Sequence, residues 1–145
     1  MVEDATSSVA QREIDLARQL AQARSWPDSL PHWRRAADIL AGSPDKRGLA
    51  NAELGCGEAL SGLREFESSL THFARAEKAY QAAGDVGGQA VACYLYAQTL
   101  VFMGRHADSF DHWRRAEELY AAIGSPSGLD AARQGLSAAV ASTGG

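Results

Sequence analysis

Three histidines stand at intervals of forty residues and are the first candidates for chemistry in this chain. His32, His72 and His112 open the phrases HWRRAADIL, HFARAEKAY and HWRRAEELY. A zinc ion needs its histidine nitrogens at about 2.1 Å, so ligands from separate elements must converge on one point. Packed helices lie about 8 to 10 Å apart, and equivalent helices of successive repeats lie farther apart still. The spacing therefore predicts histidines that serve a scaffold, with no metal site and no cofactor.

Other side chains that could carry a reaction are few. Cys56 and Cys93 do not form a CxxC pair and fall on apolar helix positions, so we expect them to act as small apolar groups. The segment GDVGG at 84–88 is rich in glycine, but it follows a helical pattern and contains no lysine, which predicts a turn. No nucleophile with a neighbouring base and no pocketed carboxylate pair stands out. The sequence predicts a protein that is not an enzyme and has no catalytic residues.

The interval of forty residues extends far beyond the histidines. A fixed period of about 20 to 50 residues is typical of stacked structural repeats, each of which is one supersecondary unit. The columns in register are Leu20, Leu60 and Leu100; Ser29, Ser69 and Ser109; Trp33, Phe73 and Trp113; and Ala36, Ala76 and Ala116.

Within each repeat, apolar residues recur every three or four positions, as an amphipathic helix requires, and they do so twice with a short break between. Each unit is therefore predicted to be a helical hairpin, with helices at 46–63 and 66–83 in the second unit. Asp45, Asp85 and Ser125 precede the first helices of units two to four, where a side-chain oxygen can cap the helix. No proline is expected inside a helix, and no strand is expected. The predicted fold class is all-α.

The predicted domain runs from 9 to 141. It contains three hairpins, at about 9–42, 47–84 and 87–124, followed by a capping helix at 127–141 that covers the last apolar face of the stack. Residues 1–8 and 142–145 are expected to be flexible ends.

These columns resemble the tetratricopeptide repeat (TPR) family, in its variant with about forty residues per repeat. In the second unit the resemblance rests on a small residue late in the first helix (Gly57), then Ser69, Phe73 and Ala76 in the second. It implies a right-handed superhelical array of antiparallel hairpins. The closing proline of shorter repeats is missing, as in bacterial members with long repeats, which occur in transcriptional regulators, peptide-sensing proteins and signalling ATPases. His106 replaces the aromatic residue near the third hairpin turn.

The resemblance also implies a concave groove, lined by the first helices of the hairpins, that holds an extended or helical peptide. Tyr94 and Phe102 are the preferred anchors, because aromatic residues dominate interface hot spots. The alternative that Phe102 packs inward against Val140 stays open. Carried over position by position, the residues expected to bind a peptide or partner are Ile14, Arg18, Asn51, Leu54, Glu58, Tyr94, Gln98, Val101 and Phe102.

One subclass does not fit. Members that grip the carboxylate at the end of a chaperone chain need lysines and asparagines on the groove face. This chain has one asparagine, Asn51, and two lysines, Lys46 and Lys78, neither of which is expected to face the groove.

The resemblance therefore implies an adaptor that binds a protein or peptide partner in the groove. The rival hypothesis is a self-associating structural or regulatory module, a homo-oligomer or a piece of a larger regulator. It rests on the first helix, where Val9, Ile14, Leu16 and Leu20 put apolar residues on more than one side. Sensing of a small molecule stays open as a third hypothesis, although three hairpins should leave the groove open.

Bulk properties narrow the partners and the location. The formal net charge of −4 argues against nucleic acid, whose backbone requires a concentrated basic face. The longest apolar stretch, from Ala90 to Gly104, is interrupted by Gln98 and Thr99 and is too short for a membrane span, which needs about 18 residues. The first eight residues lack the basic and apolar regions of a secretory signal. A cytoplasmic location is expected, with no membrane partner.

Overall fold

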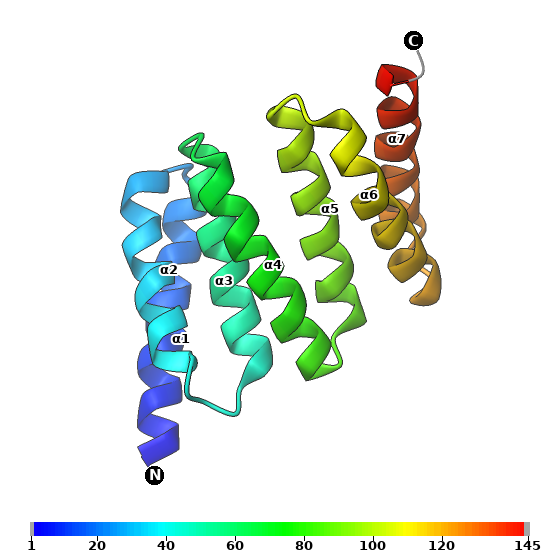
Figure 1. The fold of residues 1–145 in the computed structure, drawn as a ribbon. Helices are drawn as coiled ribbons and strands as arrows, with labels where there is room; N and C mark the ends of the chain where they lie inside the picture. Colours follow the sequence, from blue (N-terminus) through cyan, green and yellow to red (C-terminus); the bar gives the residue numbers. More distant parts are fainter. Residues whose placement is uncertain (1, 144–145) are drawn as a thin grey trace.

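Seven α-helices follow one another along residues 2–143, the part of the chain that the computed structural model describes, with side chains described for 5–143. No strand occurs among these residues, so the predicted all-α class is confirmed. Figure 1 shows the helices in a row, with the two ends of the chain at opposite ends of the row. The helices are α1 (Val2–Gln22), α2 (Trp26–Leu40), α3 (Lys46–Gly62), α4 (Phe66–Ala83), α5 (Val86–Phe102), α6 (His106–Ala122) and α7 (Pro126–Thr143).

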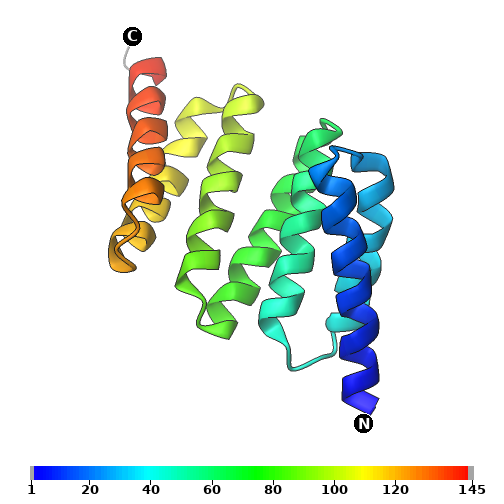
Figure 2. The ribbon, with the colours of Figure 1, turned by 180° about the vertical axis from the view of Figure 1, so that it is seen from behind.

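The odd-numbered and even-numbered helices form two different sides of this row. Seen from behind, α1, α3, α5 and α7 stand in front (Figure 2). Each odd-numbered helix contacts the next, whereas no Cα atom of α2 lies within 8 Å of α4, and none of α4 within 8 Å of α6, in these described helices. Because the odd-numbered helices are closer together, the array curves around their side, which is therefore concave.

Local chemistry sets where the helices begin and end. The carboxylates of Asp45 and Asp85 accept hydrogen bonds from the backbone N–H groups of Gly48 and Gly88, each at 2.9 Å. The Ser125 hydroxyl oxygen accepts one from the Gly128 N–H at 3.4 Å, so all three predicted caps are confirmed. Helix α4 ends at Gly84, whose φ of 71° lies in the left-handed region that glycine adopts without strain.

The turn inside each hairpin also needs one residue of positive φ. Arg24, Arg64 and Gly104 occupy this position at intervals of forty residues, with φ of 56°, 62° and 76°. Only the third hairpin uses glycine there. The first two place a residue with a side chain in a conformation that disfavours it by about 1 kcal/mol.

Two boundaries differ from expectation. Helix α1 begins at Val2 rather than at residue 9, because neither glycine nor proline interrupts the chain before Pro27. Helix α7 continues to Thr143, two residues beyond its predicted end. The expected flexible ends are thus largely helical in the structure, while residues 1, 144 and 145 lie outside the described residues. The division into one domain with flexible ends remains a prediction.

Pro31 corrects a further expectation, because it lies inside helix α2. The pyrrolidine ring of Pro31 removes one backbone donor from the second turn of α2, and its side chain is exposed. The buried side of α2 continues past it through Trp33, Ala36 and Leu40.

The core forms where aromatic rings on even-numbered helices lie against glycines on odd-numbered ones. A Cβ atom on Gly55 would overlap the Trp33 ring, and a Cβ on Gly57 would come within 2.5 Å of Phe73. Both rings are buried, with 6% of Trp33 and 1% of Phe73 exposed. The glycines of α3 therefore let α2 and α4 approach this helix closely.

Candidate functional site

A groove crosses the concave side and is made of two adjoining cavities. The first has a volume of about 320 Å³ and lies mainly between α1 and α3. The second has a volume of about 600 Å³ and extends from α1 across α3 to α5. Four residues line both cavities, so the two form one continuous groove: Ala21, Gln22, Trp26 and Glu58.

The remaining lining is mixed in chemistry. Arg18, Trp33, Asn51, Leu54 and Gly55 complete the first cavity. The second cavity is completed by Arg24, Ser61, Gly62, Phe73, Leu95, Gln98, Thr99 and Phe102. We call all these lining residues together the groove.

Aromatic rings reach the groove because α3 carries small residues where they pack. Trp26 is half-buried at the start of α2, and a Cβ atom on Gly62 would overlap its indole nitrogen. Trp33 reaches the first cavity beside Gly55 in the same way. A side chain at either glycine would displace an indole, so the small residues of α3 shape the groove.

Asn51 is held by the scaffold. The Tyr80 hydroxyl of α4 donates a hydrogen bond of 2.5 Å to the Asn51 side-chain carbonyl oxygen. Tyr80 is 3% exposed, and burial raises its pKa to about 12, with the charges of Asp85 and Glu58 adding to the effect. The tyrosine therefore stays a neutral donor and fixes Asn51 at the groove wall.

Glu58 has an unusual environment for a carboxylate. Its side chain is exposed in the groove, yet protein atoms displace enough water around it that desolvation raises its pKa. Glu58 makes no hydrogen bond or ion pair with any other residue that the structure describes. Arg18 lines the same cavity without pairing with it.

Most of the expected binding residues lie along the groove, and three do not. Arg18, Asn51, Leu54, Glu58, Gln98 and Phe102 line the groove. Ile14 is only 4% exposed, because it belongs to the stripe of Ala10, Ile14 and Ala17 that packs into the core, so it lies in the core and does not line the groove.

Tyr94 and Val101 pack against the core and do not line the groove. The Tyr94 ring meets Trp113 edge-on, with ring centroids 5.0 Å apart. Val101 packs on the cluster of Ala97, Trp113 and Ala139. Both side chains are half-buried. They face α6 and α7, which follow them in the array and cover this part of α5.

The open question about Phe102 is answered by its exposure. Its side chain is 55% exposed, and its ring lies 6.1 Å from that of Phe66 between centroids. Val140, the expected inward neighbour, is itself 48% exposed. The inward-packing alternative is therefore wrong, and Phe102 presents a large apolar surface at the groove.

Trp26 lines both cavities of the groove but was not among the residues expected there from the sequence. Its position recurs as Phe66 and His106, which marked it as part of the hairpin turn. The signal for its second role is Gly62, because a glycine at the end of α3 leaves room for an indole on the groove side.

The three histidines are engaged separately. The Nδ1 atoms of His32 and His72 lie 2.6 Å from carboxylate oxygens of Glu13 and Glu53, nineteen residues earlier in each case. These contacts tie the first helix of each hairpin to the second. Among residues 5–143 no three histidine, cysteine or acidic side chains gather as a metal site would require.

His112 has a different partner because Cys93 stands where the first two hairpins have glutamate. The His112 ring stacks on Tyr96 at 4.2 Å between centroids, and burial lowers the pKa of this histidine. The third hairpin thus replaces a polar bridge with a ring stack.

The two cysteines are buried and free. Burial is the main cause that raises the pKa of Cys56 and of Cys93, each to about 12. A thiol with so high a pKa carries almost no thiolate at neutral pH and is a poor nucleophile. The expectation that they act as small apolar groups is confirmed by their burial.

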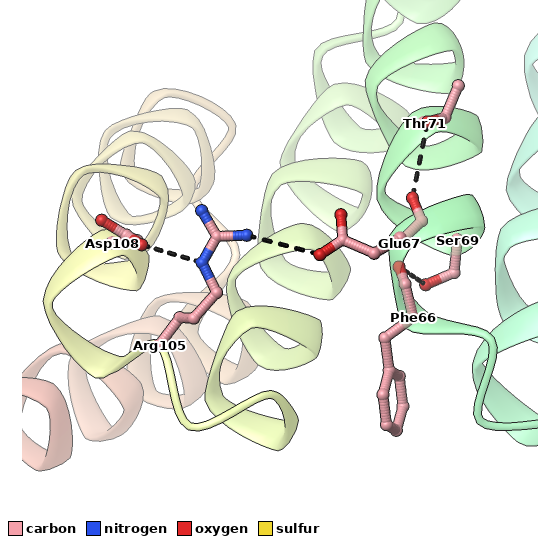
Figure 3. A network of polar contacts seen from close by, with 6 residues as sticks. All are labelled: Phe66, Glu67, Ser69, Thr71, Arg105 and Asp108. Carbon is pink, nitrogen blue, oxygen red and sulfur yellow. Dashed lines mark hydrogen bonds and ion pairs between the residues drawn. The ribbon is translucent and has the colours of Figure 1, made fainter.

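A separate cavity of about 560 Å³ lies outside the groove, between α4 and the start of α6. Figure 3 shows Arg105 between two acids: its Nε donates to Asp108 at 2.9 Å, and its Nη1 lies 3.9 Å from Glu67. Ser69 and Thr71 bond back to backbone carbonyls of their own helix. Arg105 thus links Asp108 of the third hairpin to Glu67 of the second.

No helix among the described residues is long and apolar enough to cross a membrane.

Comparison with known proteins gives a likeness in fold but none in sequence. No protein-family model matches the chain, and no curated protein matches it. The crystal structure of a TPR-like protein from Chlorobium tepidum is similar with a TM-score of 0.72 at 20% sequence identity, and the match covers 94% of this chain and 98% of that one. A kinesin light chain with TPR-like repeats from Podospora anserina matches with a TM-score of 0.40 at 11% identity, over 92% and 86%. The first likeness shows a shared fold.

Proposed function

We propose that this chain, whose fold is that of a TPR-like superhelical array, binds a segment of a protein or peptide partner in the groove and acts as an adaptor. The observation that carries the proposal is the continuity of the groove, since two cavities that share four lining residues cross α1, α3 and α5. An open groove of this length suits an extended or helical segment better than a compact ligand.

Phe102 supplies the apolar part of the recognition. A side chain of its size that is 55% exposed leaves apolar surface in water, and burial recovers about 25 cal/mol for each Å² covered. Leu54 adds a second apolar contact in the first cavity. Gln98 and Ser61 offer polar side chains between them, which suits hydrogen bonding to a peptide backbone.

A displayed random peptide library tests the proposal. Peptides selected on the immobilised chain should bind Phe102→Ala at least tenfold more weakly, because alanine removes the exposed ring. Ile123→Ala is the matched control, since Ile123 is 45% exposed and lies outside the groove. Selected peptides that bind both variants equally would count against the groove as the binding site.

Self-association is the second candidate function, and α1 favours it. Val9 and Leu16 are 47% and 46% exposed, whereas Cys56, the counterpart of Leu16 forty residues later, is fully buried by the preceding hairpin. Among the described residues, no helix covers this face of α1. Exposed apolar side chains on an uncovered helix are a typical interface.

Light scattering after size exclusion, over a concentration series, separates the two candidates. A dimer that Leu16→Glu converts to a monomer would support self-association through α1. A monomer at all concentrations would remove that candidate and leave the groove as the site of interest.

A further inference from the structure

Within the groove, we infer that the partner segment carries one basic side chain, a lysine or an arginine, whose cationic group lies between the Glu58 carboxylate and the Trp26 ring. The inference rests on the proposed function, because it names the chemistry of the segment that the groove would bind.

Glu58 is the centre of this site. It lines both cavities, so a segment that follows the groove must pass it. No described residue pairs with its carboxylate, although the surrounding protein atoms have displaced part of its water. A carboxylate that lines the groove without a partner and has lost part of its water favours an opposite charge beside it, which a bound segment can supply.

Trp26 is the second half of the site. It also lines both cavities, and its half-buried indole lies against the backbone of α3 at Gly62. The face of an indole attracts an ammonium or guanidinium group, and tryptophan is the strongest of the aromatic residues in this respect.

The other two shared residues agree with a cation. Gln22 can offer an amide oxygen, and Ala21 a methyl group beside the aliphatic stem of a basic side chain. The stretch common to both cavities thus presents a carboxylate, an aromatic ring, an amide and a methyl group, and no cation.

Two arginines limit the inference to a single basic residue. Arg18 lines only the first cavity and Arg24 only the second, and both are exposed. They flank the stretch that Glu58 and Trp26 share. A second basic residue next to the first would meet one of these arginines and be repelled, whereas an apolar neighbour could reach Phe102.

Three groups near Glu58 could compete for its carboxylate: these two arginines, from α1 and the turn after it, and Tyr80 of α4. The Glu58 charge helps to raise the pKa of Tyr80. Tyr80 is neutral and bonded to Asn51. Helix α5 contributes the uncharged Gln98 to this stretch. The carboxylate is therefore available to a cation from outside the chain.

The test starts from peptides that the library selects in a Phe102-dependent way. These peptides should share one lysine or arginine at a fixed position. Replacing that residue with methionine should weaken binding to the natural chain about tenfold, and should change little on Glu58→Gln, because the pair is already broken there. Glu118→Gln, an exposed acid on α6 outside the groove, is the matched control and should bind like the natural chain.

A charge exchange gives the complementary result. Glu58→Lys should reject the selected peptide and accept the version in which glutamate replaces its basic residue. Thermal unfolding of each variant checks that the array is intact. Titration followed by carbon NMR should also show that the pKa of the Glu58 carboxyl falls when the selected peptide binds, since a nearby cation favours the carboxylate.

Two failures have different meanings. Selected peptides that depend on Phe102 but lack a basic residue, or whose basic residue matters equally on Glu58→Gln, would overturn this inference and leave the proposed function in place. A library that yields no peptide dependent on Phe102 would overturn the proposed function and this inference with it.

Discussion

Glu53 and Glu58 lie five residues apart on α3, but one is paired inside a hairpin and the other lines the groove. The Glu53 carboxylate accepts a hydrogen bond of 2.6 Å from His72 inside the second hairpin, and Glu13 does the same with His32 in the first. Glu58 points into the groove without a partner among the described residues. One face of α3 thus carries an acid that joins the two helices of the hairpin, and the other face carries an acid that no described residue pairs with.

The acids of the two regions also differ in the direction of their pKa shifts. The hydrogen bond from His32 is the main cause that lowers the pKa of Glu13 below its ordinary 4.5. Desolvation raises the pKa of Glu58. Since the direction of a shift tells whether folding favours or disfavours the charged form, the two regions should respond to pH with opposite sign.

The largest expected effect lies on the scaffold side of α3. Leu60→Ala should lower the free energy of unfolding by about 2 to 5 kcal/mol, because Leu60 is fully buried and its removal leaves a cavity. Chemical denaturation measures it. A change as small as that of an exposed residue would show that α3 is not the buried centre of the array.

Two aromatic residues of α5 sharpen the same contrast. Tyr94→Ala should destabilise the fold by about 2 kcal/mol, because the ring packs edge-on against Trp113. Phe102→Ala should change stability by less than about 1 kcal/mol, because more than half of its side chain is exposed. Denaturation of the two variants side by side gives the comparison, and equal losses would place Phe102 in the core.

Removal of one scaffold acid should have a moderate and pH-dependent effect. Glu13→Gln should lower the free energy of unfolding by about 1 kcal/mol at neutral pH, since a hydrogen bond to a charged group is replaced by a weaker one. The pKa of Glu13 is lowered in the folded chain, so its contribution is complete above 4.5 and is lost as the pH falls through the folded value. Stability curves that stay parallel from pH 7 to well below 4.5 would contradict this.

The smallest effect is expected at the groove acid, with the opposite sign. Glu58→Gln should slightly raise stability at neutral pH, because the pKa of Glu58 is raised and folding therefore disfavours its charged form. This gain in stability should vanish as the pH falls through that raised pKa, because the natural glutamate then becomes protonated and is neutral like the glutamine. Denaturation at several pH values measures it, and a loss of stability at neutral pH would indicate an unrecognised partner for Glu58.

Much of the architecture could be predicted from the sequence because the residues that define each hairpin recur at intervals of forty residues. The caps at Asp45 and Asp85 follow from spacing and local chemistry alone. The histidine bridges were missed, although Glu13 and Glu53 recur at the same interval as His32 and His72, because the two partners stand nineteen residues apart on different helices.

The groove was harder to predict residue by residue. Helical phase puts Ile14 and Arg18 on nearly the same face, and only the packing of neighbouring helices decides that Ile14 is buried. Tyr94 and Val101 were misplaced for the same reason, since α6 and α7 cover them. The unpaired state of Glu58 depends on what surrounds it in space, which periodicity does not record.

The two buried thiols can serve as natural chemical probes of local opening in the array. Cys56 packs in a cluster shared by the first two hairpins, and Cys93 packs in a cluster with α6 and α7. Each thiol should therefore react with an alkylating reagent only when its own cluster opens. Among the described helices, Cα atoms approach within 8 Å only between helices that are one or two places apart in the chain, so parts of the array can open separately. Alkylation followed by mass spectrometry would therefore time the opening of these two clusters in the unaltered protein. A bound segment that spans α3 and α5 should slow both reactions together.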